Sequence, residues 1–269
     1  MSLAHSPCPN DTFVFHAWSH GLLSAAPPVA VTFADVDETN VAAERGDFDV
    51  VKVSYAALPW LLDDYALLPA GGALGHGCGP LVLTAGSTSP AALRGGRIAV
   101  PGERTTAYLL LRLWAGELQP EQVEVVPFHA IMPAVAAGRY EAGLVIHEAR
   151  FTYPQYGLTC VADLGGWWEE ETGLPIPLGA ILARRSLDVE RLGAVVRQSV
   201  EHAWAHPEAS GAYVGEHAQE MSPDVQHSHI ALYVNEFTRD LGPTGYAAAE
   251  TLLRRAADAG LTPTCPALR

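Results

Sequence analysis

A histidine at the end of an apolar strand is the residue of this sequence whose type and place most clearly suggest chemistry. His147 follows the run 143–146 and is followed by Glu148 and then by Arg150. Imidazole exchanges protons near neutral pH, and α/β proteins form their clefts at strand ends. We therefore take His147 as the candidate catalytic base. Because the chain has 11 histidines, the alternative is that His147 is an ordinary packing residue.

A helix start further back in the chain could hold an anion. Pro101-Gly102 ends a strand pattern, and Thr105 and Thr106 open the apolar helical run 107–114. The first amides of a helix have no intrahelical acceptor and lie at the positive end of the helix dipole, so they can bind a carboxylate or a phosphate. The alternative is that Thr105 serves only as an N-cap.

The first strand-to-helix turn offers a similar arrangement. Asn10 and Asp11 follow the segment 6–9, which two prolines make stiff. These side chains either contribute to a ligand pocket or cap the helix that begins there. Cys8 lies in the same turn, where a thiol can become more acidic. No partner base is apparent in the sequence, so we do not expect a reactive thiol.

A third strand end carries Lys52, Val53 and Ser54. The ammonium group of Lys52 could pair with a carboxylate, and the hydroxyl of Ser54 could donate a hydrogen bond to it. The alternative is a solvated lysine on a strand face.

Charge and cysteine spacing exclude several classes of function. The formal charge is −14, and no basic run is present, which argues against nucleic acid as a partner. The four cysteines are far apart without a CxxC pair, and His227 and His229 lack a third ligand at a recognisable spacing, so we expect no metal site. Neither a secretory signal pattern nor a membrane-spanning apolar stretch is evident, which predicts a cytoplasmic protein without a membrane partner.

The elements that must position these residues alternate between strands and helices. The pattern predicts strands at 29–33, 49–53, 81–83, 97–100, 123–127, 143–147 and 178–183. It predicts helices at 38–45, 54–63, 107–114, 131–137, from 189 onward, at 224–237 and at 245–259.

This order predicts an α/β protein of two domains, with mixed sheets flanked by helices and a ligand cleft between the domains. Residues 1–80 and 180–269 would form the larger, discontinuous domain, and residues 81–179 a smaller inserted one. The two connections would cross near 70–80 and 175–182. Five glycines between 71 and 79 suggest a crossing loop or a hinge, with a surface turn as the alternative.

Taken together, these motifs resemble the 1,4-dihydroxy-6-naphthoate synthases, a family of the futalosine route to menaquinone. The similarity continues through 179–185 into the terminal helices, so it covers nearly the whole chain. The segments that carry it are 6–13, 52–55, 71–75, 101–102, 105–108 and 143–153.

The resemblance implies a type 2 periplasmic-binding-protein fold adapted for catalysis. It implies a carbon–carbon lyase that converts cyclic dehypoxanthinyl futalosine, a small aromatic carboxylate, to 1,4-dihydroxy-6-naphthoate and dihydroxyacetone without a metal or an organic cofactor. By the same resemblance His147 is the proton acceptor. The implied substrate contacts are Lys52, Val53, Ser54, Thr106 and Ala107, with Asn10, Asp11 and Thr105 as further pocket residues.

Two other functions remain open at this point. The first is a non-catalytic solute-binding protein of the same fold that takes a small anion. The second is a chorismate dehydratase-like enzyme of the same pathway.

Overall fold

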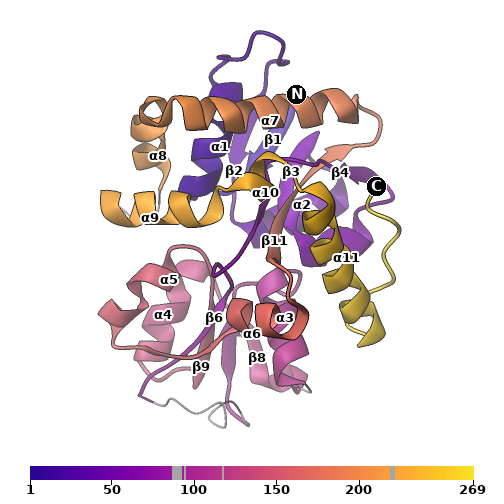
Figure 1. Ribbon diagram of the computed structural model, residues 1–269. Helices are drawn as coiled ribbons and strands as arrows, with labels where there is room; N and C mark the ends of the chain where they lie inside the picture. The colour runs from indigo at the N-terminus through magenta and orange to yellow at the C-terminus, as the bar shows by residue number, and fades with distance from the viewer. Residues whose placement is uncertain (87–92, 94, 117, 219–221) are drawn as a thin grey trace.

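The chain folds into two lobes, each built on its own β-sheet, as Figure 1 shows. The computed structural model describes residues 1–269 except 87–92, 94, 117 and 219–221. The N-terminus and the C-terminus both lie at the upper lobe of that view. Two segments of the chain pass between the lobes, one leading into β6 and one leading into β11.

The first lobe contains a six-stranded mixed sheet. Its strand order is β2-β1-β3-β11-β4, and β5 also pairs with β11. β1 runs parallel to β2 and β3, whereas β11 runs antiparallel to β3, β4 and β5. The strands are β1 (Ser2–His5), β2 (Ala30–Phe33), β3 (Val50–Ser54), β4 (Tyr65–Leu67), β5 (Ala73–Gly75) and β11 (Ile176–Arg184).

The second lobe contains a five-stranded mixed sheet of order β10-β6-β9-β7-β8. β7 runs parallel to β8 and β9, and β6 runs antiparallel to β9 and β10. The strands are β6 (Leu81–Thr84), β7 (Ile98–Val100), β8 (Val123–Val125), β9 (Ala142–Val145) and β10 (Thr159–Asp163).

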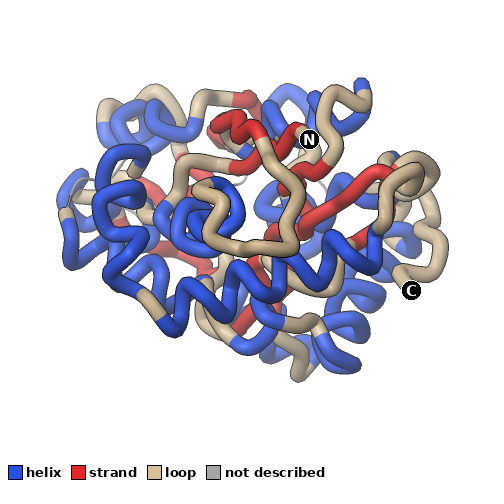
Figure 2. The backbone as a smooth tube through the Cα atoms, turned by 90° about the horizontal axis from the view of Figure 1, so that it is seen from above, coloured by secondary structure: helices blue, strands red, loops and turns tan. Residues whose placement is uncertain are grey.

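Helices flank both sheets, as the view from above in Figure 2 shows. The first lobe carries α1 (Pro9–Ser19), α2 (Val36–Arg45), α7 (Val189–Ala205), α8 (Gly211–His217), α9 (Pro223–Tyr233), α10 (Glu236–Arg239) and α11 (Gly242–Asp258). The second lobe carries α3 (Thr106–Ala115), α4 (Phe128–Ala136), α5 (Ala149–Thr152) and α6 (Leu164–Thr172).

β3 lies in the interior of the first sheet, and all five of its residues are buried. Successive side chains of a strand point to opposite faces, so Lys52 and Ser54 share one face while Val53 points to the other. Lys52 pairs with Ile181 and Ser54 with Gly179 in the neighbouring β11. This register brings the end of β3 beside the segment of β11 that enters the first lobe from the second.

The predicted mixed α/β architecture is confirmed, and two of the predicted helices differ from the structure. The segment 54–63 forms only a 3₁₀ helix, Tyr55–Trp60, which contains Pro59, because proline removes an amide donor that a longer helix needs. The segment 224–237 is broken after Tyr233, and Asn235 caps the short α10 through a reciprocal hydrogen-bond pair. Asparagine competes for local backbone groups in this way and ends a regular helix.

The glycine-rich segment is mostly buried and contains β5, so the surface-turn alternative is wrong. Close approach explains two of its glycines. A Cβ on Gly72 would lie 2.7 Å from the carbonyl oxygen of Gly179, and one on Gly79 would lie 2.2 Å from the amide nitrogen of Gly165. The hinge role and the domain boundaries at 80/81 and 179/180 stay predictions.

Candidate active site

A cavity lies where the two lobes face each other. Its walls combine the ends of β1 and β3, the first turns of α1 and α3, and the segment after β9. The lining residues are Ser6, Asn10, Asp11, Val36, Thr39, Lys52, Ser54, Ala73, Cys78, Pro80, Thr105, Thr106, Ala107, Ile146, His147, Leu178, Gly179 and Tyr233.

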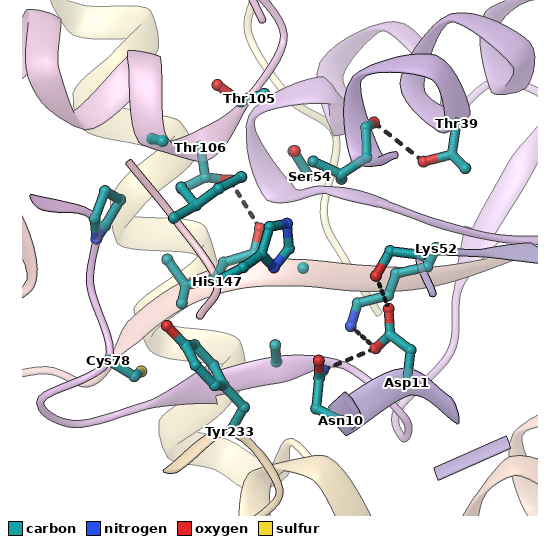
Figure 3. Close-up of a pocket in the computed structure, with 18 residues that line it drawn as sticks. Asn10, Asp11, Thr39, Lys52, Ser54, Cys78, Thr105, Thr106, His147 and Tyr233 are labelled. Atoms are coloured by element: carbon teal, nitrogen blue, oxygen red, sulfur yellow. Dashed lines mark hydrogen bonds and ion pairs between the residues drawn. The ribbon is translucent and has the colours of Figure 1, made fainter. Parts of the chain in front are cut away.

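One wall of the cavity is a buried ion pair between Lys52 and Asp11 (Figure 3). The Asp11 carboxylate also accepts hydrogen bonds from Ser6 Oγ at 2.7 Å and from Asn10 Nδ2 at 2.8 Å. Burial by itself would raise the pKa of Asp11, but the charge of Lys52, with smaller contributions from His5 and from the hydrogen bonds of Lys52 and Ser6, lowers it. Asp11 is therefore ionised, and Lys52 is the buried partner of a carboxylate instead of a solvated side chain.

The start of α3 forms another part of the wall. The Thr105 hydroxyl accepts a hydrogen bond from the amide of Tyr108, so Thr105 is the N-cap that was the alternative interpretation. The Thr106 hydroxyl donates to the carbonyl of Leu178 and accepts from the amide of Ala56, which ties α3 to the first lobe. The amides of Thr106 and Ala107, at the first two helical positions, have no intrahelical acceptor and remain able to bind an anion.

His147 is placed two residues beyond the end of β9, and its ring lies near the middle of the cavity in Figure 3. Its φ is 52°, and it is the one described non-glycine residue with a positive φ. A non-glycine residue in this region carries strain, and such residues concentrate at functional sites. The edge-to-face ring of Phe128, 5.4 Å from the imidazole between centroids, holds the side chain from behind.

The imidazole of His147 is neutral at physiological pH. Burial lowers the pKa of His147 to about 4, and the opposing influence of the Asp11 charge is smaller. A neutral imidazole has a free lone pair, which is the form that a general base needs. His147 also borders a second groove, which is lined by the acidic residues Asp35, Asp37 and Glu38.

All but one of the site residues predicted from the sequence line the same cavity. Asn10, Asp11, Lys52, Ser54, Thr105, Thr106, Ala107 and His147 all line the cavity. Val53 does not line it, because its side chain is fully buried in the core on the opposite face of β3. A contact between Val53 and a ligand would have to use the backbone.

The sequence patterns missed the aromatic wall and the groups behind His147. Tyr233, at the end of α9, lines the cavity, and burial raises the pKa of its hydroxyl, which stays protonated. Behind the cavity lies the fully buried His229, whose ring centroid is 6.4 Å from that of His147. No sequence pattern could pair these residues, because they lie on different lobes.

Cys8, His147 and Glu148 each place one potential ligand atom within 4.8 Å of the other two. Burial, followed by the nearby Glu148 and Asp11, raises the pKa of the Cys8 thiol well above its usual value. A protonated thiol is a poor metal ligand and a poor nucleophile. The expectations of no metal site and no reactive thiol stay predictions.

The two lobes and the cavity between them have the architecture of the periplasmic-binding-protein fold. A Candida albicans protein described as having the generic periplasmic binding protein fold superposes with a TM-score of 0.72 at 13% identity, covering 100% of this chain and 92% of that one. An Archaeoglobus fulgidus protein of solved structure superposes with a TM-score of 0.89 at 34% identity, covering 97% of both chains. The fold class predicted from the sequence is confirmed.

Sequence comparison identifies the family to which the chain belongs. The model of the menaquinone biosynthesis family matches residues 1–258. A 1,4-dihydroxy-6-naphtoate synthase of Streptomyces coelicolor is 62% identical, covering 98% of this chain and 95% of its own. A synthase of the same name from Thermus thermophilus is 48% identical, covering 99% of this chain and 97% of its own. The chain belongs to the menaquinone biosynthesis family, and the enzyme class predicted from the sequence is confirmed.

Among the described residues, no helix is both long enough and apolar enough to cross a membrane.

Proposed function

We propose that this enzyme carries out the reaction for which its curated relatives are named, the formation of 1,4-dihydroxy-6-naphthoate, with His147 as the proton acceptor. The substrate in this proposal is cyclic dehypoxanthinyl futalosine, and the second product is dihydroxyacetone. The observation that carries the proposal is the neutral imidazole of His147 in a cavity bounded by both lobes. The cytoplasmic location predicted from the sequence belongs to the same proposal.

The cavity suits an aromatic carboxylate that bears a polyol. The apolar lining residues Val36, Ile146 and Leu178 and the ring of Tyr233 can contact the flat aromatic part. The free amides of Thr106 and Ala107 can bind the carboxylate or a hydroxyl group. The Lys52 ammonium, held by Asp11, is the one lysine that lines the cavity and can donate to an oxygen of the substrate.

In this mechanism His147 removes a proton from the sugar-derived part of the substrate. The electrons left behind drive cleavage of a carbon–carbon bond, and the departing three-carbon fragment takes up a proton that His147 can return. The donors Lys52, Thr106 and Ala107 stabilise negative charge that develops on oxygen. Formation of the aromatic naphthoate makes the overall reaction favourable, and closure of the lobes excludes water.

Turnover by the purified protein tests this function. We expect cyclic dehypoxanthinyl futalosine, incubated with enzyme and a chelator, to yield 1,4-dihydroxy-6-naphthoate detected by chromatography. His147→Asn is the matched variant, because asparagine tolerates the left-handed backbone at this position but is no base. It should bind the substrate and release no product. Substrate binding without turnover by the wild type would reject the lyase in favour of a solute-binding protein, and full activity of His147→Asn would reject the base.

A further inference from the structure

His229 is a buried polar side chain that has no hydrogen-bond partner among the described residues. It lies on α9 of the first lobe and is 0% exposed. Within the described part of the chain, neither Nδ1 nor Nε2 of its ring forms a hydrogen bond. Buried polar groups in folded proteins are almost always bonded, so an unbonded one needs an explanation.

A carboxylate of the other lobe lies near the His229 ring. Its Nε2 lies 4.0 Å from Oε2 of Glu148, which directly follows His147 in the chain. The rings of His229 and His147 lie nearly parallel, at an interplanar angle of 29°. The contact therefore joins α9 of the first lobe to the backbone segment that carries the proposed base.

A separation of 4.0 Å is too long for a hydrogen bond, which needs about 3 Å. A relative movement of the lobes by about 1 Å would be enough to form it, and proteins of this class close their lobes on a ligand by hinge motion. Hydrogen bonds of catalytic groups are often long without substrate and shorten in the complex.

We propose that His229 is a positioning residue whose Nε2–H donates a hydrogen bond to Glu148 when the lobes close on substrate. The bond fixes the residue that follows His147, and so holds the strained backbone of His147 and directs its ring at the substrate. It also keeps the Glu148 carboxyl group beside the imidazolium that forms on His147. This inference rests on the proposed function, because the closing ligand is the substrate of that reaction.

Three variants separate positioning from packing. His229→Leu removes the donor and keeps an apolar side chain of similar length, and we expect kcat to fall on the order of 100-fold with little change in KM, since a misplacement of about 1 Å in an active site has this effect. His229→Gln places an amide N–H near the position of Nε2 and should recover most of that loss. His227→Leu is the matched control, because His227 lies two residues earlier on the same helix and is exposed.

A double-mutant cycle with Glu148→Met, which removes the acceptor and keeps the side-chain length, tests the pair directly. If His229 acts through Glu148, the kcat of Glu148→Met/His229→Leu equals that of the less active single variant, because the second change removes nothing further. The proposal would be overturned if the fold-losses of kcat in the two single variants multiplied in the double variant. Equal losses of kcat in His229→Leu and His229→Gln, or wild-type kcat in His229→Leu, would also overturn it.

A binding readout keeps this inference separate from the lyase proposal. The ¹⁵N chemical shifts of the His229 ring are recorded with and without 1,4-dihydroxy-6-naphthoate. We expect the Nε2 signal to shift as its N–H becomes hydrogen-bonded, and to keep its free-state value in Glu148→Met, which has no acceptor oxygen. An unchanged shift with the naphthoate bound, or failure of the naphthoate to bind, overturns the pair whether or not the wild type turns over substrate. A lack of turnover with the shift present would reject the lyase alone.

Discussion

The two walls of the cavity differ in how completely their polar groups are paired. At the Asp11 wall, the carboxylate receives hydrogen bonds from Ser6 and Asn10 and an ion pair from Lys52. At the His147 wall, the residue has a left-handed backbone, and the ring nitrogens of the neighbouring His229 are unbonded in the described structure. The first wall is fixed before a ligand arrives, whereas the second still has polar groups to satisfy.

This difference suits the Asp11 wall to binding the substrate and the His147 wall to the chemical step. A fully paired network is rigid and can hold a substrate in one place. A base must have a free lone pair, and its environment must accept a new charge during the reaction. The strain and the unbonded nitrogens at the second wall are a cost to stability that a purely structural region would not retain.

The largest expected effect comes from the residue that defines the second wall. His147→Asn should lower kcat by about 10²- to 10⁴-fold, the usual contribution of a general base. His147→Ala should lose the same activity and, in addition, about 1–2 kcal/mol of stability, because alanine tolerates a positive φ poorly. Turnover assays and urea unfolding of both variants measure the two effects. Equal stability of the two variants would argue against strain at this position.

The first wall is tested by breaking its ion pair. Lys52→Met should lower the free energy of unfolding by about 3–5 kcal/mol, because it leaves the Asp11 carboxylate buried without its counter-charge. The control is Arg45→Met at the exposed Arg45–Asp47 pair, which should change stability by less than about 1 kcal/mol. Urea denaturation measures both. Similar small effects in the two variants would show that the first wall is not held by its charges.

The pH dependence of kcat/KM reports the protonation of His147 at the second wall. His147 has a pKa of about 4 in the folded protein, so kcat/KM should stay level from pH 8 to about pH 5 and fall tenfold per unit below about 4. An acid limb near pH 6.5, the ordinary pKa of histidine, would contradict the burial of this base.

The lowered pKa of His147 also makes the stability of the folded protein depend on pH. Between pH 6.5 and about 4, the unfolded chain binds a proton at His147 that the folded chain does not, so the free energy of unfolding falls as the pH falls through this window. His147→Asn should show a shallower loss of stability over the same window, measured by urea unfolding at several pH values. Parallel curves for wild type and variant would remove His147 from the acid response.

The smallest expected effect concerns a residue that lines the cavity and mainly caps a helix. Thr105→Ala should lower stability by about 1 kcal/mol through loss of the α3 cap, with kcat within about twofold of wild type. Thr105→Ser keeps the hydroxyl and serves as the control. A large loss of kcat in Thr105→Ala alone would give Thr105 a direct part in the reaction.

Much of the site could be predicted from the sequence because its residues lie in short local motifs at strand ends. Lys52 and His147 each stand near the end of a strand pattern, and Thr106 opens the helix that follows another strand; such positions meet at one edge of a sheet. The limits of the 54–63 helix were missed because the pattern of apolar residues hid the effect of Pro59. The break before α10 was missed because the capping role of Asn235 depends on its position and not on its hydrophobicity.

The sequence by itself determined the mixed α/β architecture, the family and eight of the residues that line the cavity, because periodicity and strand-end motifs are local properties of the chain. Only the tertiary structure decided that Lys52 is paired with Asp11, that Val53 points into the core and that His229 lies behind His147. Lys52 is 41 positions from Asp11 in the chain, and His229 is 82 positions from His147. The first contact joins two elements of one lobe and the second joins the two lobes, and no local pattern specifies how such distant segments pack together.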